Sequence, residues 1–155
     1  MTDAILSGYK AEAQTVVFSG TQTLASLADE EWTNLSDEID NSTNKYMFAD
    51  IEVVLASAAF TGTDSTIEIY IVPCIDGTNY PNWTGDVITD EQENNPYYIG
   101  SVTTSGATEA QRLTSLRNIA LPNGKYKYGV RNRTNVALAA SGNTLKWRPH
   151  QYSSS

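Results

Sequence analysis

The chain has 155 residues, 40% of them hydrophobic, and a formal net charge of −8. This length suits one compact domain with a single core, and no segment approaches the run of about 18 apolar residues that a membrane helix needs. One cysteine, Cys74, and one histidine, His150, exclude an internal disulfide and leave no ligand set for structural zinc. We therefore expect no metal, no cofactor and no catalytic residues.

The first twenty residues lack the basic start and long apolar stretch of a secretion signal. We therefore expect the chain to be made in a cytosol and not exported. Cys74 is interpreted as a small buried apolar residue, because a nucleophilic cysteine needs a histidine partner and His150 stands near the end of the chain.

Charge is divided sharply along the chain. Residues 1–109 hold all 18 acidic side chains and two basic ones, a net charge of −16, whereas residues 110–155 hold eight basic side chains and no acid. One interpretation is that late basic strands pair with early acidic strands inside one domain. Another is that the basic end of one copy meets an acidic surface on another protein. Nucleic acid is disfavoured, because the acidic chain repels phosphate.

The first part of the chain predicts an arm followed by short elements. Residues 1–22 are expected to form an N-terminal arm that includes a strand at 13–19. Residues 23–32 favour one or two helical turns, because four apolar side chains recur at helical spacing: Leu24, Leu27, Ala28 and Trp32. A strand is expected at 31–39.

Two segments show clear period-2 alternation, which is typical of half-buried strands. In residues 46–57 we expect these side chains to point inward: Met47, Ala49, Ile51, Val53 and Leu55. In residues 65–75 the expected inward side chains are Ile67, Ile69 and Ile71. The string FTGTDS at 60–65 supplies turn residues, so the two segments are predicted to form an antiparallel hairpin.

Further strands are expected at 97–104, 125–133 and 143–149, and residues 108–119 are interpreted as a strand although a helix is the alternative. About eight short strands separated by turns predict an all-β antiparallel sandwich, a jelly roll with an N-terminal arm. The sandwich domain is placed at residues 23–152 and a C-terminal tail at 153–155.

The stretch IYIVPCIDGTNYPNW, residues 69–83, ends a strand at Asp76 and Gly77 and leads into aromatic residues. The four rings Tyr80, Trp83, Tyr97 and Tyr98 flank the polar segment 84–96. Exposed rings serve either to stack on sugars or to anchor a protein interface. A calcium loop at Asp76 is disfavoured, because the later bidentate glutamate is missing.

Four strings, in order along residues 46–152, carry a family resemblance: FADIEVVLAS, YIVPCIDGTNYPNW, NIALPNGKYKYGVRN and TNVALAASGNTLKW. Together they resemble small structural proteins of tailed bacteriophages. The resemblance implies a virion protein without enzymatic activity, a jelly-roll decoration or cement protein of the head. Its implied partners are the major capsid protein and copies of itself, with a homotrimer expected.

The resemblance favours an interface role for the rings, with Tyr80 and Trp83 as anchors. Alternation in KYKYGVRNR also places a basic row on one face of that strand, opposite Tyr126, Tyr128 and Val130. The predicted interface residues are therefore Tyr80, Trp83, Tyr97, Tyr98, Lys125, Lys127, Arg131 and Arg133. Two other functions stay open: a carbohydrate-binding module on the phage surface, and a neck or tail adaptor.

Overall fold

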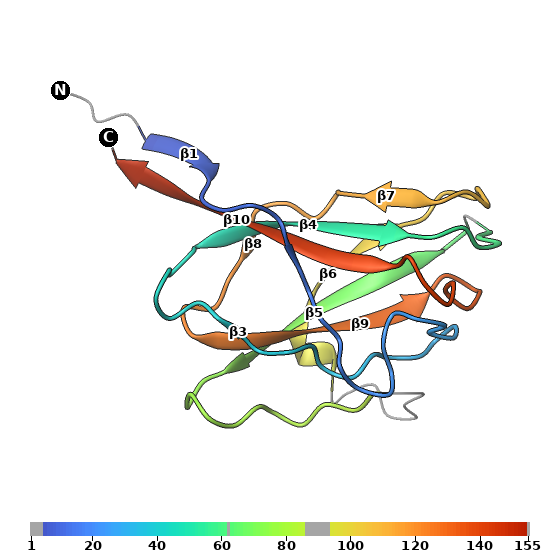
Figure 1. The fold of residues 1–155 in the computed structure, drawn as a ribbon, viewed down its shortest axis with the longest axis horizontal. Helices are drawn as coiled ribbons and strands as arrows, with labels where there is room; N and C mark the ends of the chain where they lie inside the picture. The colour runs from blue at the N-terminus through green and yellow to red at the C-terminus, as the bar shows by residue number, and fades with distance from the viewer. Residues whose placement is uncertain (1–4, 62, 86–93, 155) are drawn as a thin grey trace.

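The structure is a computed structural model that describes residues 5–61, 63–85 and 94–154. Figure 1 shows its strands, which in chain order are β1 (Ile5–Tyr9), β2 (Gln14–Thr15), β3 (Ile39–Asp40), β4 (Phe48–Leu55), β5 (Thr66–Cys74), β6 (Tyr98–Thr103), β7 (Gln111–Leu113), β8 (Ile119–Ala120), β9 (Lys125–Arg133) and β10 (Thr144–Ser154). A single 3-10 turn, η1 (Asn95–Tyr97), precedes β6. No helix in the described part of the chain is long and apolar enough to span a membrane.

The strands form two antiparallel sheets that face each other (Figure 1). Sheet A has the order β1-β10-β4-β7, with β2 also paired to β10 and β8 to β4. Sheet B has the order β3-β9-β5-β6. The all-β antiparallel sandwich predicted from the sequence is confirmed.

Strand pairing is nested from the ends of the chain toward its middle. Strands β1 and β2 pair with β10, β3 pairs with β9, β4 pairs with β7 and β8, and β5 pairs with β6. The longer ladders β4–β10 and β5–β9 join these nested pairs into the two sheets. Each early strand therefore lies beside a late one.

The predicted hairpin between residues 46–57 and 65–75 is wrong, although both strands exist. Strand β4 pairs with β10 and β5 pairs with β9, so the connection between them passes from one sheet to the other. Phe60, in that connection, is buried between the sheets. Alternation identifies which face of a strand is buried but does not say which sheet the strand joins. Met47, expected inward, is 49% exposed just before β4 begins.

The core is built from the inward faces of the long strands. Sheet A contributes Ala49, Ile51, Val53 and Leu55 from β4 with Leu145 and Trp147 from β10. Sheet B contributes Ile67, Ile69 and Ile71 from β5 with Tyr126, Tyr128 and Val130 from β9. The inward positions predicted for 125–133 and 65–75 are therefore confirmed.

The predicted helical turns at 23–32 are absent. Ser26 and Glu30 have φ of 56° and 65°, left-handed values that interrupt a right-handed helix. The apolar spacing instead reflects burial, because Leu24 and Leu27 join the core. Side-chain amides hold this segment, since Asn132 donates to the Leu27 carbonyl and Asn143 to the Leu24 carbonyl.

The strand predicted at 31–39 is reduced to β3 at its end and a single bridge at Trp32. The chain still follows β9, but two hydroxyls take the place of backbone carbonyls. Thr33 Oγ1 accepts from the Val130 N–H at 3.0 Å, and Ser36 Oγ accepts from the Tyr128 N–H at 2.9 Å. The backbone N–H groups of Thr33 and Ser36 donate back to the same two residues.

The remaining predicted strands differ mainly in length. Strand β9 has the predicted bounds, and β10 continues beyond the predicted end at 149 to include Ser153 and Ser154 of the expected tail. The strand expected at 13–19 shrinks to β2, and residues 108–119 hold β7 and the start of β8 and no helix. Most of the polar segment 84–96, the turn residue Gly62, residues 1–4 of the arm and Ser155 lie outside the described residues.

We expect Thr33→Val to destabilise the chain by about 1–3 kcal/mol, because the buried Val130 N–H loses its acceptor while the side-chain shape is kept. Urea unfolding monitored by tryptophan fluorescence measures this change. The control is Thr15→Val at an exposed position of β2, which should shift stability by no more than about 0.5 kcal/mol. Equal stability of the two variants would show that the Thr33 hydroxyl is dispensable.

Candidate functional site

The loop after β5, residues 75–85, turns back over the outer face of sheet B. Asp76 organises its start: Oδ1 accepts from the N–H groups of Thr78 and Asn79, and Oδ2 accepts from the Asn79 amide. The bonds from Asn79 and from the Thr78 N–H lower the pKa of Asp76 to about 2. Gly77 has φ of 79°, which suits glycine. The Asp-Gly pair is thus a structural turn.

Trp83, a predicted interface anchor, packs within the chain at the end of this loop. Its ring lies directly over Gly129 of β9, where an added Cβ would come within 2.2 Å of Cζ2. The indole Nε1–H donates to the Thr33 carbonyl at 2.9 Å. The ring also packs against Trp32 and Tyr70, each with its centroid 5.5 Å away. Trp83 therefore closes the outer face of sheet B.

The other predicted rings differ in how accessible they are. Tyr80 is half-buried and donates its hydroxyl to Glu38, and burial together with this carboxylate raises the pKa of Tyr80. Tyr97 is half-buried in η1 near Pro73. Tyr98 is 48% exposed and packs edge-on against Tyr70. The four rings do not form one platform.

The predicted basic row on β9 is largely neutralised within the chain. Lys125 Nζ lies 2.9 Å from Glu38 Oε1, and hydrogen bonds from Lys125 and then Tyr80 lower the pKa of that carboxyl. Lys127 Nζ lies 4.6 Å from the centre of the Tyr80 ring. Glu38 stands just before β3, so this pair joins a late basic strand to an early acidic segment that is not itself a strand. The interpretation in which late basic strands pair with early acidic strands is confirmed where β9 lies beside β5, because Arg133 pairs with Glu68.

Arg131 and Arg133 form a four-membered ion cluster with carboxylates from earlier in the chain. Arg131 lies 2.5 Å from Glu30 and 3.8 Å from Glu68, and its side chain is only 7% exposed. Arg133 lies 3.3 Å from the same two carboxylates. Glu68, Arg131 and Arg133 of this cluster line a cavity of about 440 Å³ on sheet B, together with Tyr70, Asn95 and Tyr98. Three predicted residues, Tyr98, Arg131 and Arg133, are therefore brought together.

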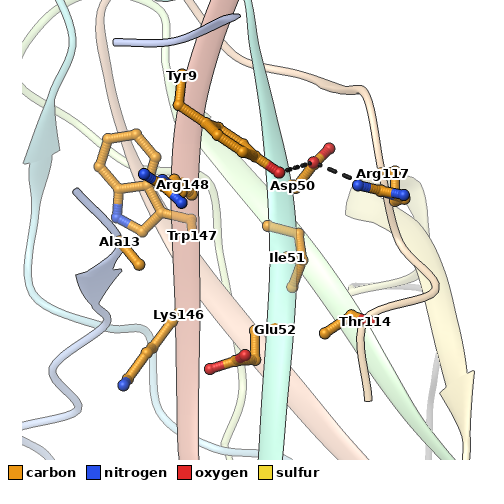
Figure 2. A pocket seen from close by; sticks show the side chains of 10 residues that line it. All are labelled: Tyr9, Ala13, Asp50, Ile51, Glu52, Thr114, Arg117, Lys146, Trp147 and Arg148. Atoms are coloured by element: carbon orange, nitrogen blue, oxygen red, sulfur yellow. Dashed lines mark hydrogen bonds and ion pairs between the residues drawn. The ribbon is translucent and has the colours of Figure 1, made fainter. Parts of the chain in front are cut away.

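A second cavity, of about 320 Å³, lies on the outer face of sheet A and is here called the sheet A cavity (Figure 2). It is lined by Tyr9, Ala13, Asp50, Ile51, Glu52, Thr114, Arg117, Lys146, Trp147 and Arg148. Four of its charged residues come from the outward positions of β4 and β10, where Glu52 faces Lys146 and Asp50 faces Arg148 in register, and Arg117 comes from the segment after β7. None of these lining residues is among the interface residues predicted from the sequence. Alternation predicts the outward carboxylates and cations, but the register that joins them is not visible in the sequence.

Asp50 connects the two walls of the sheet A cavity. Figure 2 shows its carboxylate between Tyr9 and Arg117. The Tyr9 hydroxyl donates to Oδ2 at 2.7 Å, Arg117 Nε lies 3.5 Å away, and the Asn118 N–H donates to Oδ1. Burial alone would raise the pKa of Asp50, but the Asn118 and Tyr9 hydrogen bonds and the charges of His150 and Arg117 outweigh it, so the pKa is lowered.

Tyr9 stands at the root of a two-stranded extension of sheet A. Residues 5–9 pair with residues 150–154, whereas the last residue of β10 paired with β4 is His150. Both chain ends leave the sandwich together at one corner (Figure 1). We call the paired segments 5–8 and 151–154 the terminal ribbon. The bond from Tyr9 to Asp50 fastens this ribbon to the sandwich.

No family model matches this chain, and no curated protein matches it. In the described part of the chain, no three His, Cys, Asp or Glu side chains gather closely enough to hold a metal ion. Cys74 is buried, and burial followed by the nearby Asp76 raises the pKa of its thiol.

We expect Gly129→Ala to destabilise the chain by about 1–3 kcal/mol, because the new methyl group overlaps the Trp83 ring. In the Gly129→Ala/Trp83→Leu double variant the overlap is removed, so the two effects should not add. Chemical unfolding of the four chains in this cycle gives the coupling energy. Simple additivity would show that the ring does not restrict position 129.

We expect Asp50→Asn to cost about 1–3 kcal/mol at pH 7, since a carboxylate with three donors is lost. A lowered pKa means that the carboxylate stabilises the fold above the unfolded pKa of about 4 and that this contribution disappears at lower pH. The difference from the unaltered chain should therefore shrink between pH 7 and pH 3. Urea unfolding at several pH values measures it, with the exposed Asp64→Asn as control. A difference independent of pH would contradict this role.

Proposed function

We propose that this chain is a non-enzymatic structural protein of a tailed-bacteriophage virion, a decoration or cement protein of the head. It is made in the host cytoplasm and binds the major capsid protein and copies of itself. The observation that carries the proposal is the terminal ribbon, which extends from a closed sandwich and keeps backbone groups available for a partner.

The ribbon is unusual for a chain that acts alone. A two-stranded ribbon is marginally stable in water, and its edges present unpaired N–H and C=O groups. Within the described residues, Gln151–Ser154 pair with β1 and with no other strand. Extended segments with free edges bind by adding to the sheet of another protein. The ribbon is therefore suited to hold a neighbouring subunit.

The strings that resemble phage structural proteins supply scaffold contacts. The string around YIVPCIDGTNYPNW places Trp83 over sheet B, and Asn132 and Asn143 in the later strings hold the 24–27 segment. In NIALPNGKYKYGVRN the Pro122 carbonyl accepts from Asn41. These residues therefore hold the fold of the chain itself.

The same packing favours this proposal over carbohydrate binding. A sugar platform needs several rings presented together, but Trp83 and Tyr70 are packed against Trp32 on sheet B. Tyr98 is the most exposed of the predicted rings. The neck or tail adaptor differs from the head protein in its location in the virion. The copy number per virion distinguishes them, because a head protein is repeated over the whole capsid lattice whereas an adaptor forms a single ring.

A cement protein acts by burying surface between capsid subunits. The shell must break these contacts before it expands or bursts, so bound cement raises the resistance of the particle. We expect a homotrimer on the lattice, because cyclic assembly closes and lets the ribbon of each copy reach a neighbouring surface.

Particles lacking this protein should lose resistance to heat and osmotic shock, and adding back the full chain should restore it. A chain that begins at Tyr9 lacks the N-terminal strand of the ribbon but keeps the β4–β10 pairing. We expect its attachment, measured by co-sedimentation with stripped particles, to weaken at least about tenfold, because the ribbon loses its paired form.

Circular dichroism and thermal unfolding verify that the shortened chain is folded. Attachment equal to that of the full chain would exclude the ribbon as the docking arm. Unchanged particle resistance after complete removal of the protein would contradict the cement function itself.

A further inference from the structure

The sheet A cavity lies beside the root of the terminal ribbon, so a partner held by the ribbon would lie near it. Tyr9 connects the two features, because it follows ribbon residue Gly8 in β1 and lines the cavity. The volume of about 320 Å³ is within the range of sites that bind small groups. Its walls carry charged side chains from β4, β10 and the segment after β7 (Figure 2).

The carboxylates of this face are already satisfied within the chain. Asp50 accepts from Tyr9 and Asn118 and lies next to Arg117. Glu52 accepts from Arg112 Nη1 at 2.7 Å. A ligand that enters the cavity with hydrogen-bond donors or a positive charge would therefore have to displace bonds that exist.

The cations of this face are more accessible than the carboxylates. The side chains of Arg112 and Arg117 are 65% and 66% exposed, whereas Glu52 and Asp50 are 25% and 19% exposed. Lys146 makes no ion pair with any residue that the structure describes, although Glu52 is its register partner. Of the three cations that line the cavity, Arg117 pairs with Asp50 and Arg148 with Glu12. Lys146 is therefore the lining cation whose charge is left for a ligand among the described residues.

We propose that the sheet A cavity receives a carboxylate from an acidic peptide segment of a partner protein, with Lys146 as the main cationic contact and Arg117 and Arg148 at the rim. This proposal rests on the structural function proposed above and names the chemistry of the partner. A protein partner is favoured over an acidic saccharide or nucleic acid because the adjacent ribbon offers backbone pairing, which suits an extended peptide.

Charge contacts of this kind mainly raise the rate of association and make binding sensitive to salt concentration. The matched pair of variants is Lys146→Glu on sheet A and Lys127→Glu on sheet B. Both lysines are partly exposed, and neither forms an ion pair with a described carboxylate. Both variants change the net charge equally, so a difference between them reports the site and not the total charge.

The probe is a synthetic decapeptide of alternating Glu and Thr, titrated into the ¹⁵N-labelled full chain and followed by NMR shifts. We expect saturable shifts at Glu52, Thr114 and Lys146, and at least about fivefold weaker binding for Lys146→Glu, with Lys127→Glu unchanged. Binding should also weaken strongly near 1 M salt, where the screening length falls to about 3 Å.

The same titration separates the alternatives. Equal binding of a peptide with Gln in place of Glu, or equal loss in both lysine variants, would overturn the proposal. Tighter Lys146-dependent binding of polygalacturonate or a DNA oligonucleotide would overturn the partner class. This assay uses no particles, so its result does not depend on whether the chain is found in virions. The titration therefore tests the peptide site even if the cement function is disproved.

Discussion

Pairing of early strands with late strands is the constraint on which the rest of this structure depends. The chain is strongly acidic before residue 110 and basic after it, and self-repulsion within each half would oppose folding of either alone. Pairing of β5 with β9 brings Arg131 and Arg133 to Glu68, with Glu30 beside them. Pairing of β4 with β10 aligns Lys146 with Glu52 and Arg148 with Asp50. Opposite charges thus meet across strands, where each pair adds modest stability and also disfavours a shifted register.

The two outer faces of the sandwich differ in how far they are covered by other parts of the chain. On sheet B the 75–85 loop and Trp83 cover the strands, Gly129 leaves room for the ring, and Arg131 is buried against Trp32. On sheet A the covering segments leave a cavity between them, and the cations there stay near the solvent. The proposed partner surface on sheet A therefore lies on the opposite sheet from the basic row of β9 that the sequence indicated.

Local patterns predicted the long strands but not their partners. Alternation identified β4, β5 and β9 and their buried faces, because side-chain direction is a local property of a strand. It failed at 23–39, where left-handed residues and the hydroxyls of Thr33 and Ser36 replace regular structure with specific contacts. The predicted basic row does lie on one face of β9. Arg133 in that row is paired within the chain, however, with Glu30 and Glu68, which are about 100 and 65 residues away in sequence and could not be identified as its partners from a local pattern.

The excess negative charge of the chain also shapes how it can associate. Two copies with a net charge of −8 repel each other at distance, so contact requires local surfaces where the sign is reversed or where backbone pairing supplies the attraction. The cations Lys146 and Arg117 at the sheet A cavity provide a local surface of reversed sign, and the terminal ribbon provides backbone groups for pairing. The hydrogen bond from Tyr9 to Asp50 keeps these two features side by side. Individually weak contacts become selective when a rigid element fixes their spacing, because a partner must then match both at once.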